Sequence, residues 1–240
     1  MKFLLAGDTA LVMEFGNAID PAVNAQVAAV AAKLAETPLP GVREILPTFR
    51  SLLIEYDPAV LSVCKLKRVL RSYAAHADAN AGGTYRVVHI PVCYQQEFAP
   101  DLEDVAALHN LSADEVVALH SQKEYLIYML GFLPGFAYLG GMDERLITPR
   151  LANPRTKIPA GSVGIGGEQT GIYPIASPGG WRLIGRTPLR PYDPGRETPF
   201  LYKAGDYIKF DPVDANTYRQ IEREVEAGSY QVMTEVKSWG

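Results

Sequence analysis

Seven cationic side chains lie between Arg145 and Arg190, and the only acidic residue among them is Glu168. Seven cations and one acid give this segment a formal charge of +6. Because the whole chain has a net charge of −4, the residues outside the segment carry a charge of −10. Guanidinium groups fixed on turns suit recognition of a carboxylate or phosphate, because their forked donors bind two oxygens at once. The alternative is that several of them pair with acidic residues from elsewhere or hold loop carbonyls. The seven are Arg145, Arg150, Arg155, Lys157, Arg182, Arg186 and Arg190.

A glycine-rich run at residues 161–167 (GSVGIGG) invites comparison with a phosphate-binding loop. No lysine follows the last glycine, and the next residues indicate turn and strand instead of a helix, so the P-loop pattern is not met. A tight β-turn is the favoured interpretation, and a nest of backbone N–H groups is the alternative. Ser162 and Ser177 stand outside any GxSxG elbow, so no catalytic triad is indicated.

His120 is the only histidine near the cationic segment, and it precedes a strand that leads into that segment. An imidazole at this place is a candidate general acid or base, and a structural histidine is the alternative. The four histidines and two cysteines show no HxxxH, HExxH or CxxC spacing, so no metal site is expected. Cys64 and Cys93 form no redox-type pair, which favours a reduced, cytoplasmic protein.

Glycine and proline crowd the same part of the chain, since 13 of its 21 Gly and 9 of its 18 Pro lie between Gly131 and Gly195. Each glycine permits a close backbone approach, and each proline fixes φ. Aromatic side chains beside such residues are rigid candidates for a pocket wall or a partner anchor, and core packing is the alternative. These aromatics are Phe132, Phe136, Tyr138, Tyr173 and Trp181.

The first 75 residues predict a β-α-β-β-α unit. Asp20 fits a helix N-cap, and Pro21 suits the first helical position. The order is typical of a compact α+β unit with an antiparallel sheet. The predicted elements are strands at 10–15, 42–47 and 51–56 and helices at 21–33 and 65–75.

Residues 76–84 are small, polar and glycine-rich, and they mark the best domain boundary in the chain. We expect one domain at 1–78, a linker at 79–84 and a second domain at 85–240. In the second domain, Ser112 and Glu115 form a capping-box pattern, and many short strands with Gly/Pro turns favour a barrel or sandwich. The predicted elements are strands at 85–94, 125–130, 162–165, 171–175, 181–186 and 207–210 and helices at 102–109, 112–121 and 214–227.

Composition excludes several classes of protein. Hydrophobic residues at 48% and charged residues at 21% are globular values. A net charge of −4 gives no case for binding nucleic acid or an anionic membrane. No segment offers the ~18 apolar residues that a membrane span needs, and the N-terminus lacks a signal-peptide pattern.

Ordered motifs in the glycine- and proline-rich segment resemble the allophanate hydrolase subunit 1 family. They are GFLPGFxYLG at 131–140, Pro149-Arg150, Pro154-Arg155, IPAGSV at 158–163, QTGIYP at 169–174 and SPGGW at 177–181. The first domain adds Gly7-Asp8, Phe15-Gly16, Pro47-Thr48 and Ser51-Leu52-Leu53, so the resemblance covers nearly the whole chain. The one departure is RPYD at 190–193, where a phenylalanine is expected before the aspartate.

The resemblance implies an α+β fold with a small α+β N-terminal domain followed by a cyclophilin-like β-barrel C-terminal domain. It implies the role of the B subunit in an ATP-dependent 5-oxoprolinase, which opens 5-oxo-L-proline to L-glutamate. The implied partners are a C-subunit homologue (allophanate hydrolase subunit 2 family) and an A-subunit homologue of the YcsF/LamB type. ATP would be a co-substrate of the complex. This chain shows no ATP-binding motif of its own, which agrees with a site shared between the partners.

Such a site must hold a substrate carboxylate and a developing phosphate charge, and it needs a group that handles a proton. We expect His120 to be that catalytic group. The expected substrate- or anion-binding residues are Arg150, Arg155, Lys157, Ser162, Gln169 and Thr170, and the expected pocket or interface residues are Phe132, Pro134, Phe136, Tyr173 and Trp181.

Two further functions share the same motifs. One is a protein inhibitor of a sensor histidine kinase (KipI type), and the other is a subunit of a urea- or allophanate-processing amidohydrolase. The motifs do not separate these three functions. The likeness to cyclophilin concerns architecture and does not imply prolyl isomerase activity.

Overall fold

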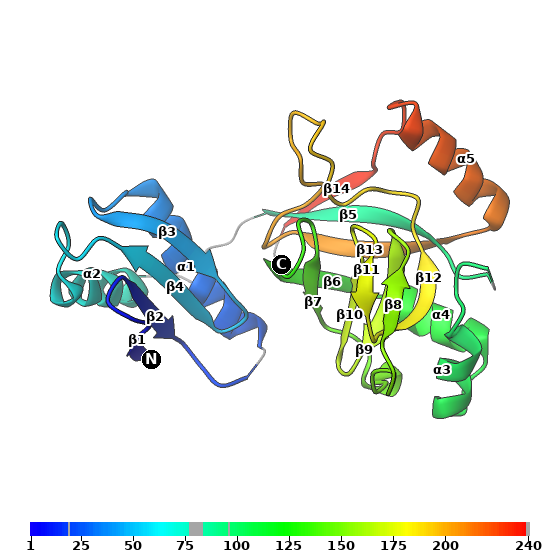
Figure 1. Ribbon diagram of the computed structural model, residues 1–240, viewed down its shortest axis with the longest axis horizontal. Coiled ribbons are helices and arrows are strands. Elements are labelled where there is room, and N and C mark those ends of the chain that lie inside the picture. Colours follow the sequence, from blue (N-terminus) through cyan, green and yellow to red (C-terminus); the bar gives the residue numbers. More distant parts are fainter. Residues whose placement is uncertain (19, 77–83, 96, 239–240) are drawn as a thin grey trace. The chain divides into compact units, whose positions relative to one another are not determined.

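The computed structural model describes residues 1–18, 20–76, 84–95 and 97–238 (Figure 1). The chain divides into two compact units, Met1–Gly83 and Thr84–Gly240, and each has its own hydrophobic core. The predicted linker at 79–84 lies outside the described residues except for Thr84, which begins a strand. The α+β class predicted from the sequence is confirmed.

The first unit is an antiparallel sheet in the order β1-β2-β4-β3, covered by two helices. Alternate residues of its central strands, among them Leu11, Met13, Leu52 and Ile54, are fully buried and form one core with both helices. One face of the sheet therefore carries the helices. The elements are β1 (Lys2–Leu5), β2 (Ala10–Glu14), α1 (Pro21–Glu36), β3 (Val42–Pro47), β4 (Ser51–Tyr56) and α2 (Val63–Ala75).

Side-chain caps begin helices α1 and α4 where the sequence predicts them. The carboxylate of Asp20 accepts hydrogen bonds from the backbone N–H groups of Ala22 (2.8 Å) and Val23 (3.0 Å). In the second unit, Ser112 and Glu115 form a reciprocal capping box. These bonds satisfy donors that a helix start leaves unpaired. None of the helices in the described residues is long and apolar enough to cross a membrane.

The second unit is built on a strongly curved, nearly closed sheet in the order β10-β9-β12-β5-β13-β6-β7, with β14 also paired to β5 (Figure 1). Helices α3, α4 and α5 pack around it. The predicted barrel is confirmed in this form. The elements are β5 (Thr84–Cys93), α3 (Leu102–His109), α4 (Ala113–Ser121), β6 (Glu124–Leu130), β7 (Ala137–Gly140), η1 (Glu144–Leu146), β8 (Arg155–Ile158), β9 (Ser162–Gly166), β10 (Gln169–Ile172), β11 (Ser177–Gly179), β12 (Arg182–Arg186), β13 (Tyr207–Val213), α5 (Ala215–Glu226) and β14 (Thr234–Ser238).

The two end strands of this sheet, β7 and β10, come close to each other. A Cβ atom on Gly171 of β10 would lie 3.2 Å from the carbonyl oxygen of Ala137 in β7. Strands β8 and β11 form a separate antiparallel pair beside the barrel. These short strands bring the glycine- and proline-rich segment together on one side of the second unit.

Candidate functional site

Five aromatic side chains form a connected cluster, which we call the Trp181 face. Its rings Phe136, Tyr173 and Trp181 are only 3–5% exposed and form a small hydrophobic core, as the core-packing alternative holds. Phe136 lies at its centre, with its ring centroid 5.5 Å from that of Trp181 and 5.8 Å from that of Tyr173. All four contacts of Phe136 within the face are edge-on, the geometry that aromatic pairs prefer. The face consists of Phe132, Phe136, Tyr138, Tyr173 and Trp181.

Glycines make room for these rings. A Cβ atom on Gly166 would lie 2.3 Å from Cδ1 and Nε1 of Trp181, and one on Gly179 would lie 2.5 Å from the Tyr173 hydroxyl. Both distances are far shorter than van der Waals contact, so only glycine lets the rings lie against the backbone. Much of the glycine density noted in the sequence therefore serves the Trp181 face.

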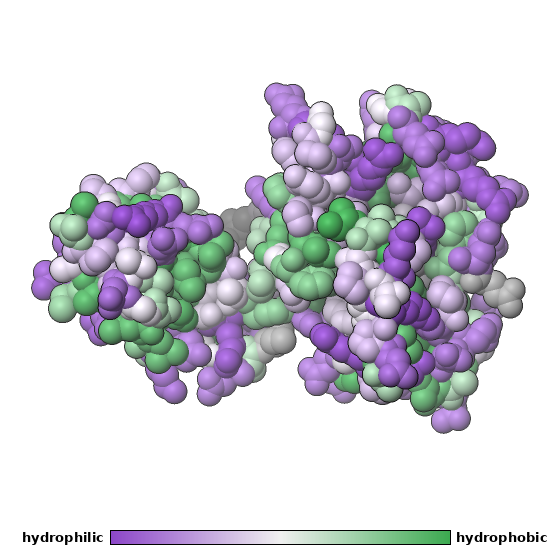
Figure 2. Space-filling view, in the orientation of Figure 1, coloured by the Kyte–Doolittle hydropathy of each residue, from purple (hydrophilic) through white to green (hydrophobic). Residues whose placement is uncertain are grey.

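Phe132 stands out on this face because its side chain is 68% exposed and its backbone is left-handed, with φ 67°. A bulky side chain rarely adopts that conformation, and holding it there costs about 1–3 kcal/mol. The neighbouring Pro134 is also exposed. Figure 2 shows a hydrophobic area on the side of β6 and β7, amid more hydrophilic surroundings. Phe132 is thus an aromatic ring presented to solvent by a strained turn.

Two predicted anion-binding cations, Arg150 and Lys157, are exposed beside this face. The Arg150 guanidinium lies 6.0 Å from the centroid of the Trp181 ring, within the range of a cation–π contact. Lys157 precedes Ile158, which packs with Phe136 and Trp181. Neither cation forms an ion pair with any acidic residue that the structure describes. Burial raises the pKa of the Tyr173 hydroxyl, whereas the positive charges of Arg150 and Arg155 lower it, so positive charge surrounds this side of the face.

Arg155, the third predicted cation, is held by the protein itself. Its two terminal nitrogens donate to the two carboxylate oxygens of Asp101, at 2.9 and 2.6 Å. Asp101 is 4% exposed and also accepts from the backbone N–H of Leu183 at 2.6 Å. Through Asp101, these hydrogen bonds connect Arg155 in β8 with the start of α3 and with Leu183 in β12. Anion binding by Arg155 stays a prediction, but most of its donors already have a structural task.

Most of the other cations in the segment pair with acidic residues or a backbone carbonyl of this chain, as the alternative interpretation holds. Arg145 binds Asp143, Arg182 lies 3.6 Å from Asp104, and the Arg186 Nε atom donates to a backbone carbonyl at 2.9 Å. Arg190 lies 3.9 Å from a carboxylate oxygen three positions along in the same loop. The seven cations are therefore not one free anion surface. Arg150 and Lys157 are the two beside the Trp181 face that have no acidic partner among the residues described.

His120 is 0% exposed and both of its ring nitrogens are bonded. Nε2 lies 2.7 Å from the Thr170 hydroxyl, Nδ1 lies 2.8 Å from the Tyr94 hydroxyl, and the ring stacks on Phe210. The Thr170 hydroxyl donates to the Gly164 carbonyl, so it accepts from Nε2–H of His120. Nδ1 then accepts from the hydroxyl of Tyr94, which assigns one tautomer to the ring.

Burial lowers the pKa of the His120 imidazole to about 3, so the ring is neutral near pH 7. It connects α4 with strand β10, which runs behind the Trp181 face. Proton transfer by His120 stays a prediction. The geometry gives the residue a second task, which is to hold Thr170 and the strand in place.

The other predicted residues are distributed around the face. Ser162 and Thr170 are buried within β9 and β10, and Gln169 is half-buried at the start of β10. The Ser162 carbonyl accepts a hydrogen bond from the backbone N–H of Tyr173 at 2.8 Å. Ser162 and Thr170 thus contribute to the frame that carries the rings, and their predicted contact with substrate stays a prediction.

Two pockets lie elsewhere on the second unit, and neither is lined by a residue predicted for the site. One, of about 1100 Å³, lies among the start of β5, the loop at 189–206 and the C-terminal segment. The other, of about 810 Å³, lies beside α3 and α4. Among the described residues, no group of His, Cys, Asp and Glu is arranged to hold a metal ion. The Trp181 face therefore lines neither of these two pockets.

A family model described as carboxyltransferase domain, subdomain C and D, matches residues 1–202. The chain belongs to this family. The B subunit of 5-oxoprolinase from Bacillus subtilis (strain 168) is 45% identical over 228 residues, which are 91% of this chain and 95% of that protein. The resemblance drawn from the sequence motifs is thereby confirmed at the level of the family.

Two larger proteins contain a region similar to this member of the carboxyltransferase subdomain C and D family. The crystal structure of TTHA0988 superposes with a TM-score of 0.76 at 39% identity, covering 86% of this chain and 40% of that one. Urea amidolyase of Saccharomyces cerevisiae is 25% identical over 264 residues, 96% of this chain but 14% of that protein. In both, the region that matches is one part of a longer chain.

The sequence interpretation missed the cationic residues Arg196 and Lys203 in the pocket of about 1100 Å³. They lie outside the glycine-rich motifs. A signal was present in the spacing of Arg190, Asp193 and Arg196, which places two arginines three residues to either side of one aspartate.

Proposed function

We propose that this chain works as the B subunit of an ATP-dependent 5-oxoprolinase, which opens 5-oxo-L-proline to L-glutamate in the cytoplasm. The observation that carries the proposal is the 45% identity to the B. subtilis relative across 95% of that protein's length. Similarity of this extent includes the segment that forms the Trp181 face. The partners we propose are a C-subunit homologue of the allophanate hydrolase subunit 2 family and an A-subunit homologue of the YcsF/LamB type.

The Trp181 face is, in this proposal, one wall of a site that a partner completes. Its rings are packed and fixed, whereas Phe132 projects into solvent from a strained turn. A rigid exposed aromatic loses little conformational entropy when a partner covers it, which is the character of an interface anchor. The longer chain of TTHA0988, of which this chain spans 40%, agrees with a domain that acts beside a second one.

The open cations beside the face suit the proposed substrates. A lactam is a poor electrophile, and transfer of a phosphoryl group from ATP to its oxygen would activate it. The substrate then carries a carboxylate and a phosphorylated oxygen on one small ring. Arg150 and Lys157 have no acidic partner in the part of the chain that the structure describes, and preorganised cations stabilise charge of this kind.

Reconstitution by omission tests this function. The purified chain and the two proposed partner homologues are assayed for 5-oxoproline-dependent ADP release as a full set and with each component left out. We expect release from the full set only. Release that persists at the same rate without this chain would refute the proposal.

The interface is tested separately by Phe132→Ser, with Leu108→Ser as the matched control because Leu108 is also exposed, at 52%, but lies on α3. Association with the C-subunit homologue is measured by size-exclusion chromatography with light scattering. We expect the Phe132 variant to weaken association about tenfold or more and the control to leave it unchanged. Equal effects from both variants would remove Phe132 from the interface.

A second candidate function is a part in a urea-processing enzyme, because the chain is similar to a region of yeast urea amidolyase. The identity there is 25%, well below the 45% to the B. subtilis relative. Urea-dependent ADP release by a reconstituted set, with none from 5-oxoproline, would favour this candidate. Inhibition of a sensor histidine kinase stays a prediction of the sequence motifs.

A further inference from the structure

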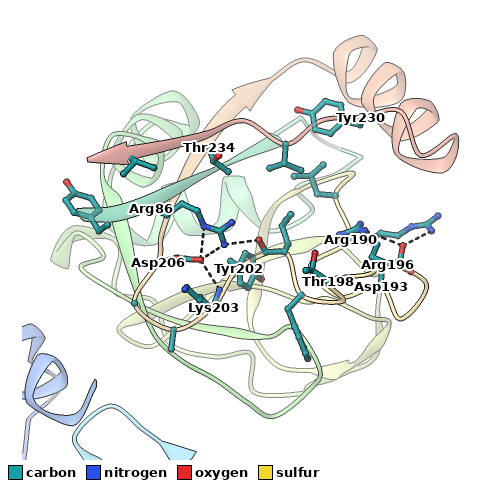
Figure 3. Close-up of a pocket in the computed structure, with 18 of the residues that line it drawn as sticks. Arg86, Arg190, Asp193, Arg196, Thr198, Tyr202, Lys203, Asp206, Tyr230 and Thr234 are labelled. Carbon is teal, nitrogen blue, oxygen red and sulfur yellow. Dashed lines mark hydrogen bonds and ion pairs between the residues drawn. The ribbon is translucent and has the colours of Figure 1, made fainter. Parts of the chain in front are cut away.

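The pocket of about 1100 Å³ lies wholly within the second unit (Figure 3), and no residue of the Trp181 face lines it. Its walls come from the first residues of β5, from the loop between β12 and β13, and from the segment around β14. A cavity of this size accommodates a cofactor-sized small molecule. None of the residues that line it enters the function proposed above.

One end of the pocket holds two arginines that share a single carboxylate. The Oδ2 atom of Asp193 lies 3.9 Å from a terminal nitrogen of Arg190 and 3.6 Å from Nε of Arg196. Both distances exceed hydrogen-bond length. The other carboxylate oxygen accepts the backbone N–H of Gly195 at 3.0 Å. The pair therefore carries an excess positive charge and leaves guanidinium donors for a ligand.

The other end of the pocket also carries an excess of positive charge. Arg86 binds Asp206 through two of its nitrogens and also donates to a backbone carbonyl at 3.3 Å. The backbone N–H of Lys203 donates to the same carboxylate at 3.0 Å, and its exposed side chain forms no ion pair among the residues described. Figure 3 shows these two charged groups at opposite sides of the pocket. Four cations against two acids give the lining an excess of two positive charges.

Between the charged ends, the pocket is lined by hydroxyl-bearing and apolar side chains. Tyr230 and Val232 come from the C-terminal segment, and Thr198 lies near the two arginines (Figure 3). Tyr230 and Val232 pack against the barrel core, so they present a fixed apolar surface. Such a lining suits a ligand with a flat or apolar body as well as negative charge.

We propose that this pocket binds a nucleoside di- or triphosphate, with phosphate oxygens held by Arg190 and Arg196 and the nucleoside against the Tyr230 side. Guanidinium forks match phosphate geometry, and two of them near one another bind more than one oxygen. The excess of two positive charges balances the charge of a magnesium-bound ATP. The choice of ATP as the probe rests on the proposed function, whereas the preference for a phosphate-bearing ligand rests on the pocket alone.

Calorimetric titration of the full-length chain tests the proposal, with ATP, ADP, adenosine, tripolyphosphate and inorganic phosphate as separate ligands. We expect saturable 1:1 binding of ATP in the presence of Mg²⁺ and much weaker binding of adenosine and of inorganic phosphate. Arg190→Gln and Arg196→Gln should each weaken ATP binding about tenfold or more, because each removes a charge-assisted contact.

Arg145→Gln is the matched control, because Arg145 also pairs with one aspartate but lies outside the pocket. It should change ATP binding less than about twofold. Circular dichroism and melting curves confirm that each variant is folded, which the exposure of Arg190 (53%) and Arg196 (34%) favours.

Three results would overturn the proposal. The first is the absence of saturable ATP binding. The second is an equal loss of ATP affinity in the control and pocket variants, and the third is that tripolyphosphate binds as tightly as ATP. These outcomes are separate from a failure of the proposed function. A complex that releases glutamate while this chain binds no ATP would overturn only the pocket, and a chain that binds ATP in a complex without turnover would overturn only the oxoprolinase role.

Discussion

Replacing His120 with glutamine should flatten the pH dependence of the stability of the second unit. Burial lowers the pKa of this imidazole to about 3, against an ordinary value of 6.5. The unfolded chain therefore binds a proton below pH 6.5 that the folded chain refuses. Stability from this group is complete above pH 6.5 and is lost as the pH falls from 6.5 toward 3.

The size of the effect follows from the two pKa values. Each pH unit between them costs about 1.4 kcal/mol, so a fall to pH 5 costs about 2 kcal/mol of unfolding free energy. This loss of about 2 kcal/mol does not depend on the exact pKa of His120 in the folded chain, provided that this pKa lies well below 5. Glutamine can still bond to Thr170 or Tyr94 but does not titrate, so the variant should lack this part of the slope.

The assay is urea denaturation at pH 7.5, 6.5, 5.75 and 5, followed by tryptophan fluorescence. Trp181 is buried within the second unit, so its fluorescence reports on that unit. His76→Gln is the control, because it removes an exposed histidine of the first unit. It should keep the wild-type curve.

The comparison between wild type and the His120 variant decides the matter. We expect wild type to lose about 2 kcal/mol more than the variant between pH 7.5 and 5. Parallel curves for the two proteins would show that the imidazole is hydrated or takes up a proton in the folded state. The buried bridge between Tyr94 and Thr170 would then be wrong.

Two further predictions concern the frame of the Trp181 face. Gly166→Ala should lower the free energy of unfolding by about 2–3 kcal/mol, because its methyl group would overlap the Trp181 ring, whereas Gly180→Ala, whose Cβ would meet its nearest atom at 3.6 Å, should be nearly neutral. Urea midpoints of the two variants check this, and equal midpoints would contradict it. Asp101→Asn should cost about 2 kcal/mol, because it weakens a buried carboxylate that accepts three hydrogen bonds. Thermal melts check this against Glu97→Gln at the exposed ion pair with Arg219, which should have a much smaller effect, and similar melting temperatures would contradict the structural role.

Local interactions made much of the fold predictable. Asp20 and Ser112 begin helices through bonds to residues within three positions, so their patterns are visible in the sequence alone. The strand pair Val42–Pro47 and Ser51–Tyr56 was predicted with the bounds that the structure gives, because a short turn joins two clear alternating runs. Strand β1 was missed, since its residues are mostly exposed and lack that alternation.

The sequence predicted a barrel as the class of fold, but it did not predict which strands pair with one another. Strand β14 was missed because it pairs with β5, some 150 positions earlier, and an alternating exposed strand near a chain end gives little signal. Strands β8 and β11 are only three or four residues long and contain proline or charge. Their pairing depends on the turns around Trp181, which single-residue preferences do not encode.

The sequence suggested candidate residues for a site, but it did not indicate which groups these residues contact. Arg155 was predicted to bind an anion, with internal pairing as the alternative, and its carboxylate partner Asp101 lies 54 positions away. Proton transfer by His120 stays a prediction, and the hydrogen bond from its ring to Thr170, 50 positions away, was not visible in the sequence. Side-chain type restricts what chemistry is possible, whereas burial and long-range partners decide whether a donor is free.

The most direct test of the proposed function offers 5-oxoproline and urea together, with ATP, to the reconstituted three-component set. Products are followed by NMR, and ADP release is followed in parallel. We predict that glutamate appears in step with ADP, only when this chain is present, and that urea is unchanged. Consumption of urea without glutamate, or glutamate formed at the same rate without this chain, would contradict the assignment as the B subunit of 5-oxoprolinase.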